Sequence, residues 1–120
     1  MIFKVNKVHG GGKNLVYVIS GIVDKEDEYK AHCLISELDR TIKLASVAFL
    51  VQEKMGLQLW WDEALTEPML PVESRGAFRF DGVRPPLDWK CQIWMRPFKV
   101  CISEDDYPTK MFVMSLDFDR

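Results

Sequence analysis

The stretch that decides the fold of this chain reads SELDRTIKLASVAFLVQEKMG and runs from Ser36 to Gly56. Its apolar residues recur three and four positions apart, which is the spacing of one face of an α-helix. Ser36 and Asp39 have side chains that cap the start of a helix, and Gly56 is the residue type that most easily ends one. The pattern therefore predicts a single long helix over residues 36–55.

The apolar side of this predicted helix is wide. At about 100° per residue it covers an arc of roughly 220°, whereas a helix that lies on one surface needs only about 100°. Such a helix has to be covered by a curved sheet or by a second copy of the chain, and we expect the curved sheet. Ala48 lies in the middle of the arc, so we expect Ala48→Asp to be strongly destabilising and Lys43→Asp to have little effect.

Alternation of polar and apolar residues predicts strands on both sides of the helix. The predicted strands cover residues 2–8, 15–23, 29–36, 57–61, 77–80, 89–95, 98–102 and 112–118. Residues 26–35 could instead begin the helix early, because the two periods are hard to separate over eight residues. The expected fold class is α+β: a curved, mainly antiparallel sheet of about seven or eight strands packed around one long helix, in the order βββα and then ββββ(β).

The connections in the second half of the chain are long for a protein of this size. Residues 62–75 and 81–88 are predicted to be loops, and loops of such length are often functional. Pro97 cannot donate a hydrogen bond to a neighbouring strand, so it is expected to mark a bulge or a break. The glycines that follow His9 predict a turn between the first two strands.

Composition limits the class of protein. The chain has 120 residues, of which 48% are hydrophobic, and this predicts a single globular domain over residues 1–120. Sixteen basic residues against eighteen acidic ones argue against binding to nucleic acid or to an anionic membrane. The three cysteines and the lack of a leader pattern predict reduced thiols and a cytoplasmic location. No apolar run is long enough to span a bilayer.

The sequence contains no complete catalytic or metal-binding pattern. His9 and the three glycines after it resemble the oxyanion loop of lipases and esterases, but no serine in the chain has the flanking glycines that this family needs at its nucleophile. His32 and Cys33 are adjacent on a predicted strand, so they point to opposite faces. Asp62 and Glu63 are most simply the polar end of a strand. We therefore expect no catalytic residue, no metal and no cofactor.

Tryptophan and arginine are concentrated in the second half of the chain, and these side chains most often anchor interfaces. Trp60 and Trp61 point to opposite faces of a predicted strand, so both are buried only if both faces are covered. The candidate ligand- or partner-binding residues are the four tryptophans and two of the arginines, namely Trp60, Trp61, Arg84, Trp89, Trp94 and Arg96.

These features favour a non-catalytic protein that acts through protein–protein interaction, as a homodimer or with another protein. The alternative is an effector-binding domain with an aromatic pocket between helix and sheet, which would take a small apolar or aromatic ligand. An enzyme of unknown class ranks below both.

Overall fold

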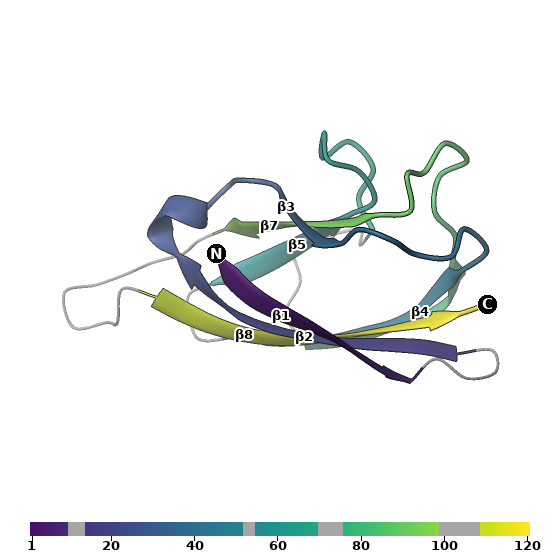
Figure 1. Cartoon of the computed structure of the whole chain (residues 1–120), viewed down its shortest axis with the longest axis horizontal. Coiled ribbons are helices and arrows are strands. Elements are labelled where there is room, and N and C mark those ends of the chain that lie inside the picture. The colour runs from purple at the N-terminus through teal and green to yellow at the C-terminus, as the bar shows by residue number, and fades with distance from the viewer. Residues whose placement is uncertain (10–13, 52–54, 70–75, 99–108) are drawn as a thin grey trace.

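The computed structural model describes residues 1–9, 14–51, 55–69, 76–98 and 109–120. Within these ranges the chain forms eight strands and one short 3₁₀ turn (Figure 1). The strands are β1 (Ile2–His9), β2 (Asn14–Asp24), β3 (His32–Ile35), β4 (Lys43–Val51), β5 (Gly56–Trp60), β6 (Gly76–Val83), β7 (Ile93–Phe98) and β8 (Thr109–Asp119); the 3₁₀ turn is η1 (Lys25–Asp27).

The strands form two antiparallel sheets that lie one above the other in Figure 1. The larger sheet has the order β1-β2-β8-β4-β6, and the smaller sheet has the order β3-β7-β5. From β2 onward the chain passes from one sheet to the other at every step. The pairs β2–β8, β3–β7 and β4–β6 are nested around β5, as if one long hairpin had been rolled across two sheets. This nesting is the strand order of a jelly roll.

The predicted helix over residues 36–55 is wrong, and the α+β fold class is wrong with it. The middle of that stretch is β4, which lies inside the larger sheet between β8 and β6. The described residues contain no α-helix, so the fold is all-β and no helix is enclosed by a sheet.

A β-bulge explains why β4 has the apolar pattern of a helix. The register with both neighbouring strands shifts between Leu44 and Ser46. The buried side chains are therefore Ile42, Leu44, Val47 and Phe49, at spacings of two, three and two residues. One extra residue in a period-two pattern produces apolar spacings that also fit a helix.

Asp39, one of the two residues that were expected to cap the helix, forms a turn instead. The Asp39 carboxylate accepts hydrogen bonds from the backbone N–H of Thr41 at 2.9 Å and from its hydroxyl at 2.7 Å. Asp side chains favour both helix caps and turns of this kind, because the same local hydrogen bonds serve either one. The turn leads directly into β4.

Most of the other strand predictions are confirmed, with changes at their ends. The predicted strand 29–36 begins only at His32. The alternative, a helix that begins early within residues 26–35, is wrong, because the only helical turn in this region is η1 and it ends at Asp27. The strand predicted from residue 89 begins at Ile93. Pro97 lies within β7 rather than ending it; its carbonyl accepts the Tyr29 N–H at 2.8 Å, beyond the end of β3. The glycine turn after His9 and most of the predicted strand 98–102 lie outside the described residues.

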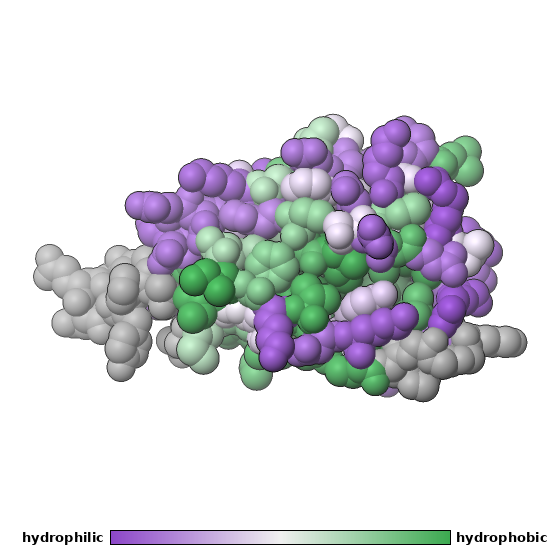
Figure 2. All heavy atoms as spheres, in the orientation of Figure 1, coloured by the Kyte–Doolittle hydropathy of each residue, from purple (hydrophilic) through white to green (hydrophobic). Residues whose placement is uncertain are grey.

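The hydrophobic core lies between the two sheets. The smaller sheet contributes side chains from alternate positions of β5 and β7, and the larger sheet contributes them from β2, β4 and β8. Figure 2 shows a band of hydrophobic residues at the surface between the two layers, with hydrophilic residues along the upper side. The fully buried members of the core include Ile19, Leu44, Leu57, Leu59, Ile93, Met95, Phe112, Met114, Leu116 and Phe118.

Among the helical segments of the described chain, none is long and apolar enough to cross a membrane.

Candidate functional site

Three of the six candidate residues lie together on the outer face of the smaller sheet. Trp60 on β5 is directly opposite Trp94 on β7, and Gln58 is directly opposite Arg96 in the next row. All four side chains are partly exposed, whereas Leu59 and Met95 between them point into the core. We call Gln58, Trp60, Trp94 and Arg96 the aromatic face.

Arg96 is held in a fixed position on this face. Its guanidinium carbon lies 5.5 Å from the centre of the Trp60 ring, within the range of a cation–π contact. Its Nε donates to Gln58 Oε1 at 2.8 Å, and its Nη2 donates to the same oxygen at 2.5 Å. Among the described residues no carboxylate forms an ion pair with Arg96.

The two indole N–H groups of the aromatic face have different surroundings. The Trp94 Nε1 donates to Gln92 Oε1 at 3.3 Å. The Trp60 Nε1 is buried and has no hydrogen-bond partner within the described parts of the chain. A buried donor without a partner destabilises the folded protein by about 1–3 kcal/mol.

Trp61 and Trp89 are buried and belong to the core. Their rings meet edge to face, with centres 5.3 Å apart and an interplanar angle of 82°. The Trp89 Nε1 donates to the Gln92 carbonyl at 2.8 Å. These two candidates therefore join the segments 61–69 and 84–92 and do not lie on the aromatic face. Arg84 is exposed just after β6, at an edge of the other sheet.

Asp62 organises the segment that follows β5. Its carboxylate accepts hydrogen bonds from the backbone N–H groups of Thr66 and Glu67 and from the Thr66 hydroxyl. Partial burial raises the pKa of the Asp62 carboxyl, but these hydrogen bonds outweigh it and hold the pKa below its usual range. The segment then returns along β5, because the Met69 N–H donates to the Leu59 carbonyl at 2.9 Å.

A cleft of about 230 Å³ lies between this segment and residues 86–92. Asp62, Glu63, Glu67, Asp88 and Lys90 are among its lining residues. Acidic residues in a cleft can bind a cation, but the described residues contain no group of three or more side chains placed to hold a metal ion.

Cys33 lies beside the aromatic face, since it pairs with Trp94 across β3 and β7. Burial raises the pKa of the Cys33 thiol, and the nearby Glu63 carboxylate raises it further. The thiol is therefore protonated near neutral pH, and it contacts the Ile35 carbonyl at 3.6 Å. A protonated thiol is a poor nucleophile, so this arrangement does not favour cysteine catalysis.

A second surface was not anticipated from the sequence. Five large apolar side chains are exposed on the outer face of the larger sheet, and we call them the apolar stripe: Ile2, Ile22, Leu50, Met111 and Val113. Ile2, Ile22 and Met111 are aligned across β1, β2 and β8, and Val113 is aligned with Leu50 in the next row. The exposed fractions reach 78% for Ile2 and 74% for Leu50.

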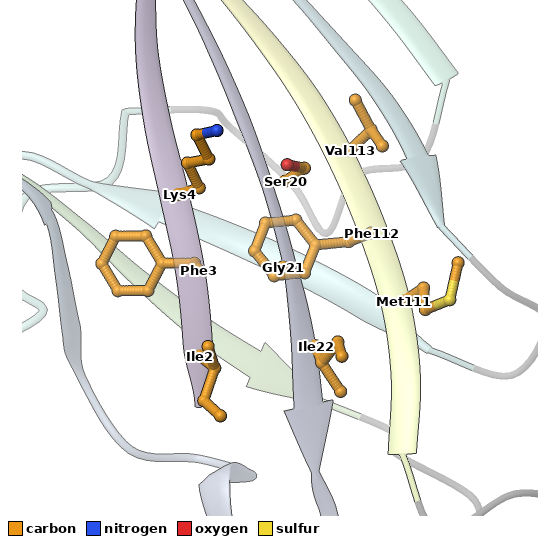
Figure 3. A pocket seen from close by; sticks show the side chains of 9 residues that line it. All are labelled: Ile2, Phe3, Lys4, Ser20, Gly21, Ile22, Met111, Phe112 and Val113. Carbon is orange, nitrogen blue, oxygen red and sulfur yellow. The ribbon is translucent and has the colours of Figure 1, made fainter.

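Four residues of the apolar stripe line a shallow hollow of about 340 Å³, namely Ile2, Ile22, Met111 and Val113. Figure 3 shows two rows of side chains across three strands, one with Lys4, Ser20 and Val113 and the other with Ile2, Ile22 and Met111. The small residues Ser20 and Gly21 lie at the centre of the lining. The sequence did contain a signal for this surface, because β2 is apolar on both faces. The same pattern is also typical of a strand that is buried on both sides.

Comparison with models of protein families, with curated proteins and with solved structures finds no match. The functional interpretation therefore rests on the geometry of these two surfaces.

Proposed function

We propose that this protein acts by binding rather than by catalysis, and that it forms a homodimer through the apolar stripe. The observation that carries the proposal is the gathering of five exposed apolar side chains on one face of the larger sheet. An antiparallel sheet with one solvated face normally places polar residues there, and a contiguous exposed apolar surface marks an interaction site.

The size of this face supports a homodimer. Strands lie about 4.8 Å apart and rise about 3.4 Å per residue. Five strands, with nine residues in β4, therefore present a face on the order of 700 Å². A stable interface of standard size buries roughly 800 Å² on each partner. Two copies stacked face to face would thus cover a surface of the required size.

The surroundings of the apolar stripe also fit an interface. The outer face also carries polar side chains, which lie at the margin of the stripe or farther along the strands. They are Lys4 and Asn6 on β1, Asp117 on β8 and Arg79 on β6. An apolar centre with a polar rim is the usual composition of a protein interface. A twofold axis in the plane of contact would bring the same apolar centre of each copy together.

The test is a measurement of molar mass by sedimentation equilibrium over a wide range of protein concentration. We expect a reversible dimer for the native protein and a monomer for Leu50→Lys, because the substitution buries a charge in the interface. Leu87→Lys is the matched control, since Leu87 is fully exposed in a loop outside the stripe. A native protein that stays monomeric, or equal effects of the two variants, would overturn the proposal.

A further inference from the structure

The aromatic face carries the positive charge of Arg96, which is held in one orientation and forms no ion pair with a carboxylate of the described residues. Gln58 accepts from the Nε and Nη2 of Arg96 on one side of the guanidinium, and the guanidinium carbon lies over the Trp60 ring. Because the guanidinium is planar, one N–H on Nη1 and one on Nη2 lie at its tip, on the side away from Nε. A pair of parallel N–H groups on a guanidinium matches the two oxygens of a carboxylate.

Flat apolar surface lies directly beside this charge. Trp60 and Trp94 occupy opposing positions on neighbouring strands, so their Cβ atoms are about 4.5–5.5 Å apart. Both indoles are partly exposed. Adjacent aromatic rings on a rigid sheet offer stacking area at little cost in conformational entropy, because the backbone beneath them is fixed by β5–β7 pairing.

We propose that the aromatic face is a second binding site, for a small ligand that carries a carboxylate beside a flat ring. The carboxylate pairs with the tip of the Arg96 guanidinium, and the ring stacks on Trp60 and Trp94. Gln58 is a positioning residue, because it contacts Arg96 and not the ligand.

This site is separate from the proposed dimer interface. The aromatic face is the outer side of the smaller sheet, and the apolar stripe is the outer side of the larger one. The hydrophobic core lies between the two sheets, so a ligand on one surface does not contact a partner on the other. Binding is therefore expected in a monomer as well as in a dimer.

The test uses three probes and the tryptophan side-chain N–H signals in ¹H–¹⁵N NMR spectra. 2-Naphthoate has the ring and the carboxylate, 2-naphthamide has the ring without the charge, and acetate has the charge without the ring. We expect naphthoate to bind about tenfold more tightly than naphthamide, and acetate to bind weakest. The signals of Trp60 and Trp94 should shift, and those of the buried Trp61 and Trp89 should move far less.

Variants show whether Arg96 provides the selectivity. Arg96→Gln should abolish the preference for naphthoate over naphthamide, and Arg96→Lys should restore it only in part because lysine lacks the fork. Gln58→Leu should weaken naphthoate binding while the charge remains. Arg84→Gln is the matched control and should bind naphthoate like the native protein. The dispersion of each spectrum shows that the variant is folded.

Several results would overturn the inference: equal affinity for naphthoate and naphthamide, equal losses in Arg96→Gln and Arg84→Gln, or naphthoate shifts confined to Trp61 and Trp89. The same titration in the Leu50→Lys variant separates this inference from the proposed homodimer. Unchanged naphthoate binding in a monomeric variant is the expected result, and loss of binding there would contradict the independence of the two surfaces.

Discussion

Gly56 begins β5 directly opposite Phe98 of β7, and the phenyl ring covers the space where a side chain would be. A Cβ atom at residue 56 would lie 2.2 Å from Cζ of that ring, which is far inside van der Waals contact. An aromatic ring over a glycine on the neighbouring strand buries backbone that would otherwise be exposed. Glycine at this position is therefore required by packing.

The predicted consequence is that Gly56→Ala lowers the free energy of unfolding by about 1–3 kcal/mol, because the ring of Phe98 has to move. Urea denaturation would measure the change. The double variant Gly56→Ala/Phe98→Leu should lose less stability than the sum of the two single variants, since leucine leaves room for the added methyl group. Strict additivity would show that the ring does not limit this site.

Asp62 makes the segment after β5 sensitive to pH. Its pKa is lowered in the folded protein, so its contribution to stability is complete above the pKa of the unfolded chain, about 4, and is lost as pH falls through the folded pKa. The difference in unfolding free energy between the native protein and Asp62→Asn should therefore be largest at neutral pH and shrink below pH of about 4.

Urea denaturation at a series of pH values would measure this difference. Thr66→Ala removes the hydroxyl that donates to Asp62, so the pH-dependent part of the difference should be smaller in that background. A difference that grows on acidification would contradict the assignment.

At the level of elements, β4 shows where prediction from sequence succeeds and fails. β2 and β8 pair with each other without a register shift, and the strands predicted at residues 15–23 and 112–118 lie within the observed Asn14–Asp24 and Thr109–Asp119. β4 contains the bulge after Leu44, which shifts the alternation and creates helical spacings. Period alone cannot distinguish a bulged strand from a helix, because the distinction depends on the neighbouring strands that accept the extra residue.

The candidate site shows a similar division. The opposite orientation of Trp60 and Trp61 follows from strand geometry and could be predicted, and the structure buries Trp61 while leaving Trp60 partly exposed. Which of the two faces the core depends on the position of the second sheet, and no local pattern contains that information. The apolar stripe was missed for the same reason, since apolar residues on both faces of a strand are compatible with one or two covering layers.

A pair of substitutions distinguishes the strand from the predicted helix. Val47 is buried and Ala48 is exposed, although both lie within the apolar arc of the helix. The expected sensitivity of Ala48 is therefore wrong, because it was based on the helix. Val47→Asp should cost several kcal/mol of stability and Ala48→Asp much less, on the scale of about 3 against below 1 kcal/mol. Melting temperatures at low protein concentration would show this, and equal losses would contradict the strand.

For the whole molecule, the nested pairing determines how the chain folds. β2 and β8 lie side by side although they are at opposite ends of the sequence, and β3 and β7 are almost as far apart in the chain. Closing such long loops costs entropy before the paired strands stabilise one another. Folding should therefore depend on late, distant contacts rather than on local ones.

We expect refolding on the scale of milliseconds to seconds, as for other β-proteins dominated by distant pairing. Stopped-flow fluorescence would follow the burial of Trp61 and Trp89, which come together only when the segments after β5 and β6 meet. Complete refolding within microseconds would mean that local contacts suffice, and it would contradict the importance of the nested topology.

The register of β1 shifts between Lys7 and His9, and among the described strands β1 is at one edge of the larger sheet. Lysines and an irregular register on an edge strand both hinder pairing with a strand of another molecule. The edge strand β1, which carries Lys4 and Lys7, is therefore a poor template for polymerisation. In the homodimer that we propose, in contrast, the second copy covers the outer face of the larger sheet, so no further copy can bind there. Assembly of this protein should accordingly stop at pairs, and concentrated solutions should remain clear of fibres.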